Sequence, residues 1–165
     1  MKVLLTGAGG QLAKAITCAF TGHEIISLKR ADLDITDFDA ATSALSRTKP
    51  DVLINCAAYN DVDGAETDWR RAFLVNGIGV KNLALACNKT AAALVHFSSD
   101  YVFGGGTHAD RKRPFTIADR PEPANRYGES KLLGETFVRD LAERYFLIRT
   151  SWVFGEGERS FPNRL

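Results

Sequence analysis

Short apolar runs alternate along this chain with longer stretches in which apolar residues recur every three or four positions. Short runs bounded by turn residues predict buried strands, and the three-to-four spacing predicts helices with one apolar face. Strands are expected at residues 3–5, 24–28, 52–54, 92–97 and 145–149, and helices at residues 12–19, 38–47, 69–88 and 127–144. Residues 98–125 are rich in Gly, Pro and charge, and are expected to form mostly loop.

Strands that alternate with helices at this spacing favour a parallel sheet covered on both faces. Crossover connections in such sheets are right-handed, which leaves a doubly wound, Rossmann-like α/β sheet as the predicted fold. The length of 165 residues fits one domain, so residues 1–165 are expected to form a single unit.

Charge and composition narrow the functional class. The 21 basic and 20 acidic residues give a net charge of +1, which offers no electrostatic case for binding nucleic acid or an anionic membrane. The three cysteines are far apart and form no CxxC pair, as expected for a reduced cytoplasmic chain. The start, MKVLLTGAGG, has too short an apolar run for a signal peptide, and no stretch approaches the ~20 apolar residues of a membrane helix.

A glycine cluster follows the first predicted strand. Gly7 and Gly10 suit a sharp turn that a phosphate can approach closely, at the start of a helix whose free N–H groups attract anions. Ala13 stands where a third glycine could be, and is small enough for the helix to pack on the strand. A turn of this kind directly after the first strand predicts a dinucleotide site.

The end of the second predicted strand indicates which dinucleotide binds. An acidic residue is typical there when NAD is bound, whereas this chain has Lys29 and Arg30. Two cations suit a ribose 2′-phosphate, because a guanidinium pairs with phosphate through two hydrogen bonds. NADP(H) is therefore favoured, while Asp32 and Asp34 close behind keep NAD(H) open as the alternative.

Tyr127 and Lys131 lie four residues apart at the start of a predicted helix, and so share a face. A lysine ammonium beside a tyrosine favours the phenolate, and is expected to lower the tyrosine pKa toward neutrality and make it a better proton shuttle. Ser98 and Ser99 end the fourth strand, at the edge where open α/β sheets bind ligands. A hydroxyl there could hydrogen-bond a substrate carbonyl while Tyr127 protonates it.

These features together resemble the short-chain dehydrogenase/reductase superfamily in its extended form, which acts on nucleotide sugars. Within it, the resemblance is closest to the dTDP-4-dehydrorhamnose reductase family. The matching stretches occur in the family's order and cover essentially the whole chain: TGAGGQLA at 6–13, DLDITD at 32–37, PDVLINCAAYNDVDGAE at 50–66, VN at 75–76, HFSSDYVFGG at 96–105, PANRYGESKLLGE at 123–135 and IRTSWVFG at 148–155.

The resemblance implies an NAD(P)H-dependent reduction of a sugar 4-keto group, with roles for particular residues. It implies Ser99, Tyr127 and Lys131 as the catalytic triad, with Tyr127 as general acid and Lys131 also binding the nicotinamide ribose. It implies that Gly7 and Gly10 cradle the pyrophosphate. The other implied cofactor contacts are Gln11 and Leu12 beneath the pyrophosphate, Asp34 and Ile35 on the adenine side, and the wall formed by Ala57, Ala58 and Tyr59.

The chain departs from the family's pattern in a few places. Ser99 stands where the family usually has threonine, and Asn60 replaces a usual threonine. The family also continues beyond Gly155 with a further strand and a carboxy-terminal lobe that grips the substrate, whereas this chain stops at Leu165. The expectation is an amino-terminal cofactor half without its substrate lobe, whose sheet edge a second copy could cover in a homodimer.

Two alternative functions stay open at this point. The same triad serves other nucleotide-sugar reductases and epimerases, and a non-catalytic NADP-binding regulatory subunit, like the beta subunit of methionine adenosyltransferase, resembles the same subfamily. No metal site is predicted, because His23, His96 and His108 are scattered and Asp61, Asp63 and Glu66 fit a solvated helix start better than a cation site.

Overall fold

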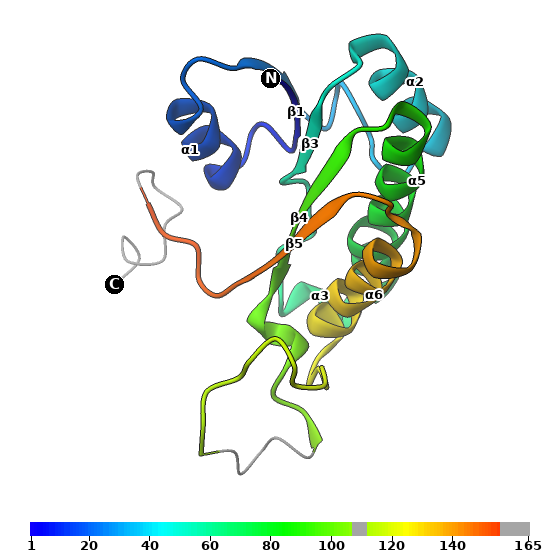
Figure 1. The fold of residues 1–165 in the computed structure, drawn as a ribbon. Helices are drawn as coiled ribbons and strands as arrows, with labels where there is room; N and C mark the ends of the chain where they lie inside the picture. Colours follow the sequence, from blue (N-terminus) through cyan, green and yellow to red (C-terminus); the bar gives the residue numbers. More distant parts are fainter. Residues whose placement is uncertain (107–111, 156–165) are drawn as a thin grey trace.

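The computed structural model describes residues 1–106 and 112–155; His108 and the end of the chain, residues 156–165, lie outside these ranges (Figure 1). Strands and helices alternate along the described chain, as the sequence predicts. The strands are β1 (Lys2–Thr6), β2 (Glu24–Leu28), β3 (Val52–Asn55), β4 (Ala93–Ser99) and β5 (Tyr145–Thr150). The helical elements are α1 (Gln11–Ala19), α2 (Phe38–Thr48), α3 (Gly64–Thr67), α4 (Trp69–Phe73), η1 (Leu74–Gly79), α5 (Val80–Thr90), η2 (Asp100–Val102) and α6 (Arg126–Leu141).

The strands form one parallel sheet in the order β2-β1-β3-β4-β5. The chain moves outward from β1 to β2 and then returns to the other side of β1 to build β3, β4 and β5. The strand order therefore reverses between β1 and β3, and open α/β sheets bind ligands at such a switch point. The α/β, doubly wound, Rossmann-like class predicted from sequence is confirmed.

Helices cover the two faces of the sheet unequally. Helices α2, α5 and α6 lie on one face, and α1 lies on the other beside β1 (Figure 1). Because side chains alternate along a strand, Leu4, Leu53 and Leu94 pack toward the three-helix side. Val3 and Leu5 pack toward α1 through Ala13, which is fully buried, as expected for the small residue after the glycine turn.

The helix expected at residues 69–88 is not one regular helix. It consists of α4, a π-helical segment η1, and α5. A π turn inserts an extra residue into a helix and is frequent at functional sites. It is packed closely here: a Cβ on Gly77 would lie 2.6 Å from Leu133 Cδ2, so glycine lets η1 approach α6. Asn76, within η1, is buried.

Helix α6 begins and ends earlier than its apolar spacing suggests. Asn125 caps it, with Oδ1 accepting a hydrogen bond from the Gly128 N–H at 2.7 Å. The prediction that this helix ends at residue 144 is wrong, because the segment after Leu141 forms hydrogen bonds with the end of α5 instead. The Glu143 N–H donates to Asn88 Oδ1, and the Arg144 guanidinium donates to the Ala91 carbonyl.

Strand β5 lies at an edge of the described sheet and presents apolar side chains to solvent, with Phe146 65% and Ile148 41% exposed. Homodimer formation over such an edge stays a prediction. None of the helices in residues 1–106 and 112–155 is long and apolar enough to cross a membrane. A cytoplasmic location also stays a prediction.

Candidate cofactor and catalytic site

The sequence-predicted site residues gather at the carboxyl edge of the sheet. The Gly7 turn follows β1, Ala57 and Ala58 follow β3, and Ser99 ends β4. Since these strands are parallel neighbours, their carboxyl ends meet at one edge, on both sides of the switch point between β1 and β3. Tyr127 reaches the same edge from the first turn of α6.

Gly7 makes the close approach that the turn requires. Its φ of 67° lies in the left-handed region, and a Cβ there would sit 2.6 Å from the Ala57 nitrogen and the Cys56 carbonyl carbon. Only glycine avoids both the backbone strain and the overlap. The turn closes with a hydrogen bond from the Gly10 N–H to the Gly7 carbonyl at 2.9 Å.

The start of α1 leaves backbone donors available for an anion. Gly10 is the N-cap residue, and no side chain of residues 1–106 and 112–155 caps the helix, so within the described chain the first N–H groups of α1 lack a capping partner. The Gln11 side chain is buried at its amide nitrogen, which has no hydrogen-bond partner among the described residues. Leu12 faces a groove of about 270 Å³ that it shares with Phe97 and Ile148.

The charged residues after β2 are exposed and loosely held. Arg30 faces Asp34 across 3.6 Å, with side chains 69% and 45% exposed. Such a pair contributes at most about 1 kcal/mol, so the guanidinium can turn to a stronger anion. The side chain of Lys29 is exposed beside it. Hydrogen bonds from Thr36 to the Asp34 carboxylate lower the pKa of Asp34, which stays a carboxylate at neutral pH.

Two residues expected to line the cofactor point elsewhere with their side chains. Ile35 is 4% exposed and packs in the core, where a Cβ on Gly79 would lie 2.7 Å from its Cγ1. Tyr59 sends its hydroxyl toward Gly64 and Asp61. The backbone of Tyr59 is fixed by Asn76, whose side-chain amide bonds both its N–H and its carbonyl, at 2.9 and 3.0 Å.

Tyr127 is almost buried, at 9% exposure, with its ring edge-on to Tyr101 at 5.6 Å between centroids. The structure corrects the expectation that Lys131 lowers the pKa of Tyr127. Burial raises that pKa, and the side-chain hydrogen bond with Ser99 offsets only part of the increase. At neutral pH Tyr127 is therefore a protonated phenol held beside the Ser99 hydroxyl.

Lys131 is bonded to the backbone of β4. Its Nζ donates to the Phe97 carbonyl at 2.7 Å, and the side chain is 3% exposed. Burial lowers the pKa of Lys131 to about 8, although the nearby Glu135 carboxylate raises it. The sequence predicts that Lys131 shares a helix face with Tyr127, but not its contact with β4, because backbone carbonyl positions are not visible in residue spacing.

Glu135 anchors the helix that carries Tyr127 and Lys131. Its carboxylate receives two hydrogen bonds from the Arg149 guanidinium of β5, at 2.8 and 2.7 Å, and lies 3.2 Å from Arg139. Burial alone would raise the pKa of Glu135, but the hydrogen bonds from Arg149 keep it below its usual range. A bidentate pair of this kind fixes α6 on the edge of the sheet.

The sequence reading missed the polar residues that support this edge: Thr6, Asn55, Asn76 and Glu135. These residues could have been found in the sequence as polar residues at positions where the strand or helix pattern predicts a buried apolar one. Thr6 and Asn55 each follow a run of buried apolar residues in their strands. Asn76 stands on the side of its helix that carries Phe73 and Val80.

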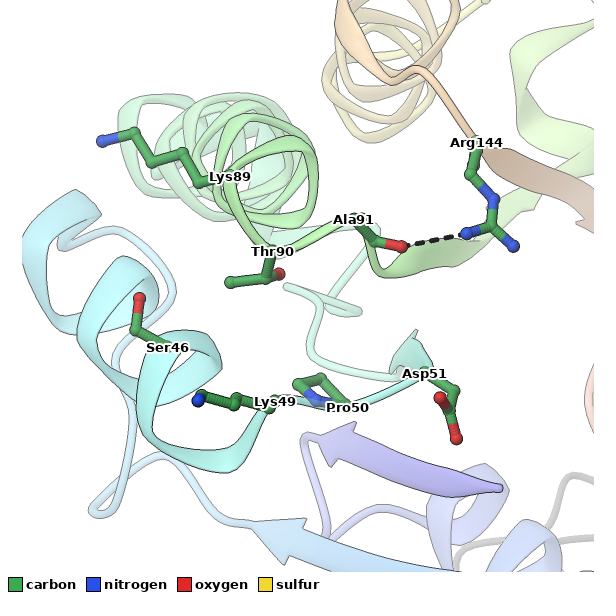
Figure 2. A pocket seen from close by; sticks show the side chains of 8 residues that line it. All are labelled: Ser46, Lys49, Pro50, Asp51, Lys89, Thr90, Ala91 and Arg144. Atoms are coloured by element: carbon green, nitrogen blue, oxygen red, sulfur yellow. Dashed lines mark hydrogen bonds between the residues drawn. The ribbon is translucent and has the colours of Figure 1, made fainter.

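Another cavity, of about 560 Å³, lies away from this site (Figure 2). Its lining comes from the ends of α2 and α5 and the segments that lead into β3 and β5, at the amino-terminal edge of the sheet: Ser46, Lys49, Pro50, Asp51, Lys89, Thr90, Ala91 and Arg144. Helix C-termini attract cations, which accounts for the basic side chains there. The proposed catalytic residues and the Gly7 turn lie at the opposite, carboxyl edge of the sheet.

Residues 1–165 match the family described as the RmlD substrate binding domain. Among curated proteins, dTDP-4-dehydrorhamnose reductase from Mycolicibacterium smegmatis is 40% identical over 161 residues, which are 96% of this chain and 48% of that protein. The chain spans about half the length of the curated relatives it matches.

Solved structures are similar over nearly the whole chain. A dTDP-4-dehydrorhamnose reductase from Clostridium acetobutylicum superposes with a TM-score of 0.89 at 42% identity, covering 95% of this chain and 55% of that one. A dTDP-4-dehydrorhamnose reductase from Bacillus anthracis in complex with NADP superposes with a TM-score of 0.91 at 37% identity, covering 97% and 56%.

Replacing Gly7 with alanine tests the close approach at the switch point. The free energy of unfolding of the Gly7→Ala variant is expected to be lower than that of the parent chain by ~2 kcal/mol or more. The alanine would have both a positive φ and an overlap with Cys56 and Ala57. Gly22→Ala, with positive φ but open space around it, should cost about 1 kcal/mol, and Gly9→Ala nearly nothing. Chemical denaturation measures all three. Equal losses for Gly7→Ala and Gly22→Ala would contradict the packing argument.

The buried ammonium of Lys131 predicts a pH-dependent stability. Its pKa is about 8 in the folded chain and near 10.5 unfolded, so the unfolded state binds more protons between these values. The free energy of unfolding should therefore rise with pH through this window, relative to the isosteric Lys131→Met variant. Taking the difference in the free energy of unfolding between the parent and this variant cancels the contributions of the cysteines and of Tyr127, which titrate in both proteins. Chemical denaturation of both proteins from about pH 7 to pH 10 measures this difference. A difference that does not change with pH would refute the burial of the Lys131 charge.

Proposed function

Because this chain belongs to the RmlD substrate binding domain family, we propose that residues 1–165 form the cofactor-binding domain of a reductase that acts on a nucleotide sugar. The relatives that carry the name dTDP-4-dehydrorhamnose reductase support the assignment, at 40% identity over almost the whole chain. The observation that carries it is the presence of Ser99, Tyr127 and the Gly7 turn at the same edge of the sheet, with Lys131 one helical turn after Tyr127.

The proposed reaction is the reduction of the 4-keto group of dTDP-4-dehydro-6-deoxy-L-mannose (dTDP-4-dehydrorhamnose), which gives dTDP-L-rhamnose. A bound nicotinamide cofactor supplies the hydride for such a reduction. The names of the similar proteins favour this reaction over that of an epimerase.

The residues present fit a nicotinamide dinucleotide. The Gly7 turn has no side chain at the point where the β1–α1 loop meets Ala57, and the uncapped start of α1 offers N–H groups for the pyrophosphate. Lys29 and Arg30, exposed after β2, would pair with a 2′-phosphate, which favours NADP(H) over NAD(H). The Bacillus anthracis relative was solved with NADP, which agrees with this preference.

The chain's own groups then perform the proton chemistry. Tyr127 is a neutral phenol at physiological pH, because burial raises its pKa, so it has a proton to donate to the reduced carbonyl oxygen. The hydroxyl of Ser99 lies close enough to Tyr127 to lower its pKa, and would hold the same oxygen. Lys131 lies one turn further along α6, with its ammonium hydrogen-bonded to the Phe97 carbonyl. In this proposal it also binds the nicotinamide ribose.

Calorimetric titration of the chain with NADPH and NADH tests the cofactor half of this proposal. NADPH should bind more tightly than NADH, since only NADPH carries the phosphate that Lys29 and Arg30 would pair with. Arg30→Ala and Lys29→Ala should each weaken NADPH binding about tenfold, equivalent to about 1.4 kcal/mol, and leave NADH binding nearly unchanged. Arg47→Ala, in the exposed last turn of α2, is the matched control and should change neither affinity. Equal affinities for NADPH and NADH would contradict the proposal that Lys29 and Arg30 bind the 2′-phosphate.

Turnover of the 4-keto sugar nucleotide with NADPH tests the role of Tyr127. Removing the hydroxyl in Tyr127→Phe takes away the proton donor and should lower kcat at least ~100-fold, while NADPH affinity changes little. Tyr101→Phe keeps an aromatic ring against Tyr127 and should retain kcat within about threefold. An active Tyr127→Phe variant would assign the proton to another group.

A further inference from the structure

A row of buried polar side chains crosses the sheet just below the proposed site. Thr6 of β1, Asn55 of β3 and His96 of β4 are register partners on adjacent strands. The Thr6 hydroxyl donates to Asn55 Oδ1 at 2.7 Å, and Asn55 Nδ2 lies 3.2 Å from His96 Nδ1. All three side chains are at most 2% exposed. The hydrogen bonds therefore form one continuous chain from the glycine turn to β4.

The backbone of Ala57 fixes the direction of this chain. Its N–H donates to Asn55 Oδ1 at 3.0 Å, so that atom must be the amide oxygen and Nδ2 must face His96. Because Nδ2 only donates, His96 Nδ1 has to accept, and the ring proton stands on Nε2. A second proton on Nδ1 would point at the donor Nδ2. The contacts of Nδ1 thus favour a neutral histidine with its proton on Nε2, a buried atom that has no hydrogen-bond partner among the described residues.

A neutral ring at this position matters for Lys131. Burial and the positive charge of Lys131 both hold the pKa of His96 well below its usual range. The Lys131 ammonium is bonded to the carbonyl of Phe97, the next residue in β4. Glu135, on the same helix, is the charged group that raises the pKa of Lys131, and Arg149 of β5 is hydrogen-bonded to Glu135. Tyr127 lies one helical turn before Lys131. A charged His96 would place a second cation against a buried one.

We propose that His96 is a positioning residue of the cofactor site, acting through its neutral Nε2–H tautomer. On one side it holds Asn55, and through Asn55 the Ala57 backbone against which Gly7 packs. On the other side it keeps the surroundings of Lys131 free of a second positive charge. The role rests on the proposed function, because the cofactor site is the one assigned above.

Substitutions at His96 separate positioning from simple packing. His96→Gln retains a neutral acceptor for Asn55, whereas His96→Leu retains only bulk. Leu94→Ala, on the same strand and the same face two residues earlier, removes buried volume away from the row. Titration with NADPH should show His96→Leu binding about tenfold more weakly, and His96→Gln and Leu94→Ala within about threefold of the parent. Parent-like affinity for His96→Leu, or an equal loss for Leu94→Ala, would overturn the proposal.

A second measurement needs no cofactor. Nitrogen-15 NMR of the imidazole in the unliganded chain should show the proton on Nε2, and no titration of His96 between about pH 8 and pH 5. A proton on Nδ1, or titration near the ordinary value of about 6.5, would also overturn the proposal. If the parent chain binds no NADPH, the proposed function fails, and the tautomer measurement decides the state of His96 by itself.

Discussion

The contact between the first turn and the end of the third strand constrains everything else at this edge. Gly7 lies against the Cys56–Ala57 backbone so closely that any side chain would overlap it. This contact is possible because β1 and β3 are hydrogen-bonded neighbours in register up to Thr6 and Asn55. It places the start of α1 beside the end of β3, and so brings backbone donors to the same sheet edge as Ser99 and Tyr127.

Burying the charged side chains of Lys131 and Glu135 at this edge costs desolvation free energy, and neighbouring groups offset that cost. The ammonium of Lys131 has a backbone carbonyl and lies near Glu135, and Glu135 has two guanidinium donors from Arg149. Charges removed from water are tolerated when their hydrogen bonds are satisfied in this way. The same low-dielectric surroundings keep Tyr127 protonated. The environment of the proposed acid therefore depends on the packing of α6 against β4 and β5.

Much of the architecture follows from residue patterns, because strand and helix periodicities are local properties. The five strands, the glycine turn and the meeting of Ser99 with Tyr127 could all be predicted. The π-helical segment could not, since one inserted residue does not alter apolar spacing enough to show. Nor could the pKa direction of Tyr127, because burial outweighs a lysine whose ammonium bonds to Phe97. The row through Thr6, Asn55 and His96 depends on strand register, which the sequence leaves open.

Mapping the NADPH contact surface by NMR tests the central claim most directly, namely that the carboxyl edge at the β1/β3 switch point binds the cofactor. Titration of the isotope-labelled chain should shift the backbone amides that follow β1, β2 and β3, with Gly7, Gly10 and Ala57 among the largest changes. The amides around Lys49 and Ala91, at the opposite edge, should stay unchanged. The largest shifts at Lys49 and Ala91, with Gly7 and Ala57 unaffected, would contradict the account.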